Sequence, residues 1–215
     1  MLQKVPESIS IPFNCWRRRS TWTKNGILFI HVPKAAGTSI SYAIYGRSLG
    51  HLKAIEISRW CPNEFSSLFK FAFVRNPWDR LVSAYRFAVK GQTEIAGMRN
   101  SKQYKTNPFR SFDSFVYEWL YEKDLMTLDY VFQPQHLFIS DENKISLVDF
   151  IGKVELFDHD LEKVSEITGK TIDSLNLNRI SKQSNYIQYY KDSQLINSVG
   201  DIYHDDVSFL GYDFK

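Results

Sequence analysis

The stretch GILFIHVPKAAGTSI, residues 26–40, contains a short apolar run followed by a proline, a lysine, a glycine and two hydroxyl residues. A continuous apolar run bounded by Gly26 and Pro33 is typical of a strand buried on both faces of a parallel sheet. The small hydroxyl residues after Gly37 are suited to opening and capping a helix. The sequence therefore predicts a strand, a tight turn and a helix in direct succession.

A second segment of the same kind is FKFAFVRNPWDRLVSAY, residues 69–85, in which Pro77 can occupy the first turn of a helix. A third apolar run, residues 145–155, supplies another strand. Strand–turn–helix units in series imply parallel strands with helices packed on them. We therefore expect an α/β fold: a P-loop-like, three-layer fold with a central parallel β-sheet flanked by helices.

The length and composition fit one globular domain. The chain has 215 residues, of which 43% are apolar and 24% charged, and its formal net charge of +3 is too small to argue for a nucleic-acid partner. We expect a single domain over residues 26–215. Residues 1–25 contain Pro6 and Pro12 and show no sustained periodicity, so we expect an irregular N-terminal arm there.

The two cysteines and the lack of long apolar runs bear on the compartment. Cys15 and Cys61 have no metal-ligand spacing and are too few for a disulfide framework, although one bridge between them stays open. No run is long enough for a membrane span, and the N-terminus lacks the apolar core of a signal peptide. We therefore expect a cytoplasmic chain, whose oligomeric state the sequence does not indicate.

The first turn has the makings of an anion site. A tight turn between a parallel strand and a helix points several backbone N–H groups one way, with the positive end of the helix dipole behind them. Gly37 lets the backbone come close to an anion, and the Lys34 ammonium can reach across the turn. The alternative interpretation is a plain strand-to-helix connection.

The second turn adds an arginine. Arg75 falls at the end of its predicted strand, and Ser83 lies on the following helix, so a guanidinium and a hydroxyl could meet on one anion. The alternative is that Arg75 pairs with Asp79 and Ser83 is a packing residue. Two anion sites at the ends of neighbouring strands indicate a ligand with phosphate at both ends of a nucleoside.

A P-loop kinase or nucleotidase fits these turns less well. A kinase loop places its lysine directly after the last glycine, whereas Lys34 precedes Gly37. Such enzymes also hold magnesium with an acidic residue at a strand end, where this chain has Arg75.

HVPKAAGTSI and FKFAFVRNPWDRLVSAY together closely resemble the two cofactor signatures of sulfotransferases that use 3′-phosphoadenylyl sulfate (PAPS). The resemblance is to the carbohydrate sulfotransferase family, of the sulfotransferase family 2-like, bacterial type. LVDFIGKVELFDHDL, residues 147–161, and FLGYDF, residues 209–214, are similar to its later segments. The resemblance implies transfer of a sulfuryl group from PAPS to a hydroxyl of an oligo- or polysaccharide, with PAP as product.

The resemblance also implies roles for individual residues. Those matching the signature for the 5′-phosphosulfate are Lys34, Ala36, Gly37, Thr38 and Ser39, and those matching the signature for the 3′-phosphate are Arg75 and Ser83. A weaker likeness in SKQSNYIQYY, residues 181–190, puts Lys182 and Ser184 near the 3′-phosphate, the alternative being a polar surface loop. Sulfuryl transfer develops charge on the oxygen bridging to the 5′-phosphate. A lysine ahead of the turn can donate to that oxygen, so we expect no metal.

The acceptor hydroxyl needs a base, for which His51 is the leading candidate. It lies in GHLKAIEI at a place where related bacterial sequences resemble H-x-T-A-x-E, and an imidazole suits the task. Lys53 stands where those relatives often have threonine. His136 and Glu56 are the other candidates, and His51 could instead be a loop residue with a structural hydrogen bond.

Two further alternatives concern the acceptor and the activity. Residues 75–110 carry eight Lys or Arg against two acidic residues, which favours an acidic or already sulfated acceptor unless the charge serves the cofactor or a solvated face. A chain with these turns but no base would be a non-catalytic PAPS-, nucleotide- or glycan-binding module of the same fold.

Overall fold

The structure of the protein is a computed structural model that describes residues 6–92, 97–98, 101–172 and 185–215. The chain divides into two compact units, each assembled from two separate segments. The first unit comprises Met1–Val74 and Gln135–Arg179, and the second comprises Arg75–Pro134 and Ile180–Lys215. Neither unit is continuous in sequence, and the single domain expected over residues 26–215 stays a prediction.

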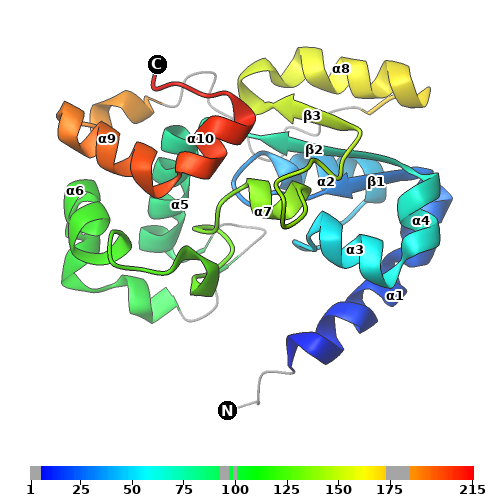
Figure 1. The fold of residues 1–215 in the computed structure, drawn as a ribbon, viewed down its shortest axis with the longest axis horizontal. Helices are drawn as coiled ribbons and strands as arrows, with labels where there is room; N and C mark the ends of the chain where they lie inside the picture. Colours follow the sequence, from blue (N-terminus) through cyan, green and yellow to red (C-terminus); the bar gives the residue numbers. More distant parts are fainter. Residues whose placement is uncertain (1–5, 93–96, 99–100, 173–184) are drawn as a thin grey trace. The chain divides into compact units, whose positions relative to one another are not determined.

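A parallel sheet forms the centre of the first unit (Figure 1). Its strands in spatial order are β1 (Ile27–Ile30), β2 (Phe69–Val74) and β3 (Phe150–Lys153). The helices of this unit are α1 (Glu7–Asn25), α2 (Gly37–Tyr45), α3 (Ala54–Trp60), α4 (Pro62–Ser67), α7 (His136–Ile139) and α8 (Phe157–Thr168). Each predicted apolar run contains one strand. The expected α/β fold with a parallel sheet flanked by helices is therefore confirmed.

Both faces of the sheet are buried, as the unbroken apolar runs require. One face carries Phe29, Phe71 and Phe73, which pack with Ile40 of α2 and Leu161 of α8 in one hydrophobic cluster. The residues that alternate with them point to the opposite face, and all four are fully buried: Leu28, Ile30, Ala72 and Val74. Burial on both sides holds the carboxyl ends of β1 and β2 in place.

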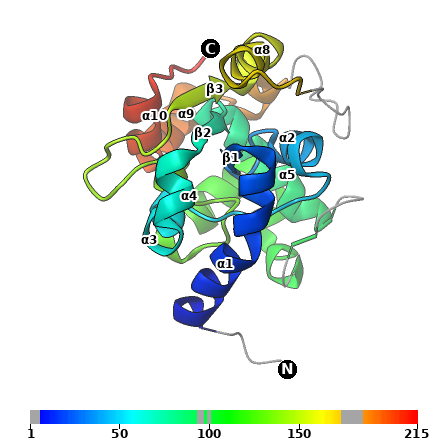
Figure 2. The same cartoon turned by 90° about the vertical axis from the view of Figure 1, so that its right-hand side faces the viewer.

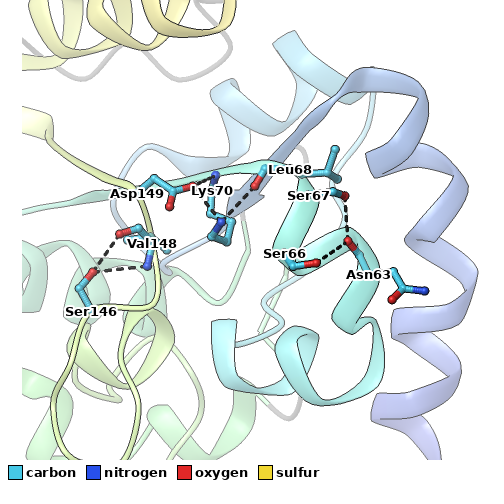
Figure 3. Close-up of polar contacts among 8 residues, drawn as sticks. All are labelled: Asn63, Ser66, Ser67, Leu68, Lys70, Ser146, Val148 and Asp149. Atoms are coloured by element: carbon cyan, nitrogen blue, oxygen red, sulfur yellow. Dashed lines mark hydrogen bonds and ion pairs between the residues drawn. The ribbon is translucent and has the colours of Figure 1, made fainter.

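A charged clamp sets the register between β2 and the chain entering β3 (Figure 3). The Asp149 carboxylate accepts a hydrogen bond from the Lys70 backbone N–H at 2.8 Å and lies 2.9 Å from the Lys70 ammonium. The Asp149 N–H in turn donates to the Lys70 carbonyl at 2.8 Å. At the other end of this close-up, the Ser66 and Ser67 hydroxyls donate to the Asn63 carbonyl and close the last turn of α4 before β2 begins.

The N-terminal arm is helical, which corrects the expectation of an irregular segment. Pro6 stands at the N-cap of α1, and Pro12 lies inside the helix, where it removes one backbone donor. Trp22 and the free Cys15 are buried, and α1 contacts β1, α2, α3 and α4. Packing of one helix face against distant elements therefore stabilises α1 more than Pro12 destabilises it. The local sequence pattern did not reveal this packing.

The second unit is held together by aromatic side chains. Its helices are α5 (Pro77–Lys90), α6 (Phe112–Ser114), α9 (Ser193–Ile202) and α10 (His204–Leu210), with the π-helical turn η3 (Phe115–Leu120) and the 3-10 turns η1 (Ser101–Tyr104), η2 (Asn107–Arg110), η4 (Leu125–Thr127) and η7 (Tyr186–Tyr189). Phe109 packs on the rings of Tyr85, Tyr104, Phe115 and Trp119 at centroid distances of 5.1–6.4 Å. Residues 101–110 are thus anchored by the buried rings of Tyr104 and Phe109.

Gly152 provides a test of the sheet packing. It is the register partner of Phe73, and a Cβ at position 152 would lie 2.7 Å from the Phe73 ring. We expect Gly152→Ala to lower the free energy of unfolding by about 1–3 kcal/mol, because the buried ring has little room to move. Chemical denaturation measures this change. A matched control is Gly97→Ala, whose nearest neighbours lie at 3.8 Å; equal stability of both variants would contradict the prediction.

Candidate functional site

The turn between β1 and α2 is built from strained backbone. Lys34 and Ala36 have φ angles of 68° and 61°, in the left-handed region that side-chain-bearing residues rarely adopt. Such strain concentrates at functional sites, and alternating backbone conformations turn successive N–H groups towards one concave surface. Ala36 is the N-cap of α2 and provides no side-chain acceptor. Thr38 and Ser39, which we expected to cap this helix, lie inside its first turn.

Gly37 has a steric role in addition to the predicted one. Its φ angle is not positive, but a Cβ at this position would lie 2.0 Å from Cδ2 and 2.4 Å from Nε2 of His31. The His31 ring therefore fills the space that a side chain at position 37 would occupy. The end of β1 and the start of α2 are locked together by this contact, which shapes the turn that contains Lys34.

His31 and His51 form a pair beside the turn. Their ring centroids are 4.2 Å apart, and His51 Nδ1 lies 3.0 Å from the carbonyl oxygen of His31. A carbonyl only accepts hydrogen bonds, so His51 Nδ1 carries the hydrogen and donates it. In the neutral ring this leaves the lone pair on Nε2, the nitrogen that can take up a proton.

Burial and a nearby cation keep both imidazoles neutral. Burial lowers the pKa of His31 well below its ordinary value, and repulsion of its charged form by a protonated His51 and by Lys34 lowers it further. Burial also lowers the pKa of His51; its hydrogen bond to His31 opposes this shift, and the Lys34 charge adds to it. His31, Lys34 and His51 therefore act on one another electrostatically, as parts of one site.

The two other candidate bases belong to the same unit, and one of them has a structural task. The Glu56 carboxylate accepts a hydrogen bond from the Lys53 backbone N–H at 2.7 Å and so caps the first turn of α3, while burial raises its pKa. His136 is buried in α7, a helix that packs on α3. The Lys53 ammonium lies 5.6 Å from the ring centroid of Phe138 in α7.

The second signature follows β2 directly and opens α5. The Asn76 side chain accepts hydrogen bonds from the N–H groups of Trp78 and Asp79, at 3.1 and 3.5 Å. Arg75 Nε lies 2.7 Å from Asp79 Oδ2, the ion pair considered as an alternative to anion binding. Asp79 and Ser83 are four residues apart on α5 and share a helix face.

Other polar residues of this signature support the second unit and were missed at the level of sequence. The Trp78 indole donates to the Ile196 carbonyl, and the Asn76 amide donates to the Asp213 carbonyl, each at 2.9 Å. Fully buried Arg80 donates to the carbonyls of Val131 and Gln133 at 3.1 and 2.5 Å. The one hint of these contacts in the sequence was a run of polar residues at the start of an otherwise apolar helix.

The structure thus divides the predicted site residues into two groups. The first unit brings together the turn residues from Lys34 to Ser39 and His51. The second unit contains Arg75 and Ser83. Lys182 and Ser184 lie outside the described residues.

A comparison of the chain with known protein families gives one clear match. The profile of the sulfotransferase family matches residues 21–213. The chain belongs to the sulfotransferase family. No curated protein and no solved structure matches it.

Membership in the sulfotransferase family makes the chain a transferase of sulfuryl groups, a reaction for which this family generally uses PAPS. The described residues contain no group of three or more His, Cys, Asp or Glu side chains that could hold a metal ion. Within the same residues, none of the helices has both the length and the apolar character needed to cross a membrane.

The contact between His31 and Gly37 can be tested by a double-mutant cycle. We expect Gly37→Ala to lower the free energy of unfolding by about 1–3 kcal/mol, because its methyl group collides with the imidazole. His31→Ala removes that collision, so the double variant should be more stable than the sum of the single changes by about 1 kcal/mol.

The control for this cycle pairs Gly37→Ala with His159→Ala, which alters an exposed histidine of α8. Those two changes should be additive. Additivity of Gly37→Ala with His31→Ala as well, measured by denaturant unfolding, would show that the contact does not constrain position 37.

Proposed function

We propose that this sulfotransferase moves the sulfuryl group of PAPS to a hydroxyl of a carbohydrate acceptor by in-line attack with a general base. The observation that carries the proposal is the grouping of Lys34, the strained turn and His51 in the first unit. An anion-binding turn, a cation and an imidazole with its lone pair on Nε2 are the components that this reaction needs. Family membership supports the same reaction type.

The residues of the turn are suited to the 5′-phosphosulfate of the donor. The N-cap of α2 has no side-chain acceptor, so its first turn depends on other partners, and an anion there would also meet the helix dipole. Lys34 carries a positive charge whose effect reaches both histidines. Thr38 and Ser39 add hydroxyl donors to the same turn.

PAPS supplies an activated sulfuryl group on a phosphate leaving group. Lys34 donates a hydrogen bond to the bridging oxygen as negative charge develops there, and the backbone N–H groups of the turn hold the 5′-phosphate. His51 Nε2 accepts the proton of the attacking hydroxyl, and the resulting imidazolium stays oriented by the bond from Nδ1 to the His31 carbonyl. We propose that no metal is needed, because Lys34 neutralises the leaving group.

For the 3′-phosphate we propose Arg75 and Ser83. The ion pair with Asp79 uses Arg75 Nε and fixes the guanidinium close to the start of α5. A guanidinium held in this way loses little conformational entropy when it binds phosphate. Lys182 and Ser184 stay candidates for the same phosphate by resemblance alone.

The acceptor is proposed to be an oligo- or polysaccharide, with an acidic sugar favoured by Lys53. This residue follows His51 by two positions, and its ammonium is held beside the Phe138 ring. A cytoplasmic location stays a prediction. The alternative function is a binding module, and it is tested by adding PAPS with a panel of neutral and acidic glycans. Tight PAP binding without PAP release from PAPS on any glycan would favour the module.

Lys34 and Arg75 should differ in what they contribute. We expect Lys34→Ala to lower kcat by about 100-fold or more with little change in PAP affinity, because its partner charge appears in the transition state. Arg75→Ala should weaken PAP binding by about tenfold or more with a smaller effect on kcat. Steady-state kinetics and calorimetric PAP titration measure the two effects.

Two controls separate binding from folding at the second signature. Asp79→Asn breaks the ion pair that positions the guanidinium but keeps the guanidinium itself, so PAP affinity should fall by less than in Arg75→Ala. Lys90→Ala alters an exposed lysine of α5 and should change neither quantity. Loss of affinity in Asp79→Asn equal to that in Arg75→Ala would mean that Arg75 acts only through its ion pair.

The base assignment predicts a specific pH dependence. His51 must be neutral to accept a proton, and its pKa is lowered from 6.5, so kcat/KM should stay level as pH falls through 6.5 and decline only below it. Lys34→Gln removes one of the causes of this lowering, so the acid limb of the remaining activity should move to higher pH. His51→Ala should lose about 100-fold or more in turnover.

The same measurements on His136→Ala and Glu56→Gln provide the comparison, at matched PAPS saturation. We expect Glu56→Gln to affect stability more than turnover, since its carboxylate caps α3. Near-normal turnover in His51→Ala would refute the assignment and make the more impaired of the other two variants the candidate base.

A further inference from the structure

Three large apolar side chains of α1 are exposed along one line of the helix. Ile9, Phe13 and Trp16 are 62%, 53% and 64% exposed. Their spacing of four and three residues puts them on one helix face. The rings of Phe13 and Trp16 have centroids 6.3 Å apart. These three residues are called the α1 stripe.

The stripe is not needed to hold α1 in the fold. The opposite face of the helix contributes buried Cys15 and Trp22 to the first unit. Arg19 forms an ion pair with Glu64 of α4 at 2.7 Å. In both Figure 1 and Figure 2 the N-terminal half of α1 extends beyond α3 and α4. The helix is therefore anchored from one side, and the stripe is on the other.

Positive charge accompanies the stripe. The basic residues of α1 are Arg17, Arg18, Arg19 and Lys24, and its only acidic residue is Glu7. Arg18 lies on the buried side of the helix beside Cys15, and Arg19 is paired with Glu64, so Arg17 and Lys24 are the cations available beside the stripe. The Arg17 guanidinium lies 5.8 Å from the centroid of the Phe13 ring, and neither Arg17 nor Lys24 forms an ion pair with another described residue. The surface thus combines aromatic and aliphatic groups with cations on one helix.

We propose that α1 binds the surface of an anionic lipid bilayer, with the α1 stripe entering the boundary between headgroups and acyl chains. Helices that lie in this boundary bury Trp, Phe and aliphatic side chains and keep Arg and Lys at the phosphate level. Anionic lipids complement the charge of the helix. A second copy would bring Arg17 and Lys24 of two helices together, and a nucleic acid would leave the apolar stripe in water. The proposal does not depend on the sulfotransferase reaction.

The experiment is co-sedimentation of the full chain with vesicles. One set contains phosphatidylcholine alone, and the other an equimolar mixture of phosphatidylcholine and phosphatidylglycerol, each at low and raised salt. We expect binding to the anionic vesicles that weakens with salt. The double variant Phe13→Ser/Trp16→Ser should bind them about tenfold or more weakly. Arg17→Glu should weaken binding to the anionic vesicles.

The matched control is Trp60→Ser, which removes an aromatic ring that is 48% exposed on α3, outside the stripe. It should bind like the parent, and circular dichroism checks that every variant is folded. Absence of binding to anionic vesicles at low salt, or equal binding by the double variant, would overturn the proposal. A self-association seen by sedimentation velocity without vesicles, and abolished in the double variant, would instead assign the stripe to a second copy.

Discussion

The geometry of the candidate site depends on a steric constraint at the carboxyl end of β1, where the His31 ring occupies the space that a side chain at position 37 would need. Because the ring is buried, neither partner can move away without opening a cavity in the core. The constraint fixes the path of the chain between the strand and α2. Lys34 and Ala36 are consequently held in left-handed conformations that they would not adopt alone.

The same contact has an electrostatic consequence. His31 is held in an environment that disfavours its charge, and its carbonyl orients His51 through the hydrogen bond to Nδ1. Two charged imidazoles would repel the Lys34 ammonium, whereas two neutral imidazoles do not. The steric packing of a glycine and a histidine thus prepares the charge state in which Lys34 can serve an anionic ligand.

The second signature combines structural and candidate binding residues in one short segment. Asn76 caps α5 and also contacts the C-terminal segment through Asp213. Trp78 and Arg80 connect the same helix to backbone carbonyls far away in sequence. These hydrogen bonds tie the start of α5 to the backbone of other segments of the second unit. A change in this segment can therefore alter stability and ligand binding together, and the two effects need separate measurements.

Local patterns were sufficient to predict the three strands, the parallel sheet, the helices that begin at Gly37 and Pro77, and the grouping of lysine, glycine and hydroxyl residues in one turn. These features follow from side-chain hydrophobicity and backbone preference over a few neighbouring residues. They therefore do not depend on which distant segments come into contact. The helical state of α1 and the steric reason for Gly37 depended on the tertiary structure. They arise from the burial of Cys15 and Trp22 against other elements and from the position of the His31 ring. The bond from the Lys53 N–H to the Glu56 carboxylate spans only three residues, and Glu56 was predicted only as a candidate base. The tertiary structure alone decides which side chains collide, as at His31 and Gly37. It also decides which ionisable groups are buried next to one another, because the separate segments must first pack together.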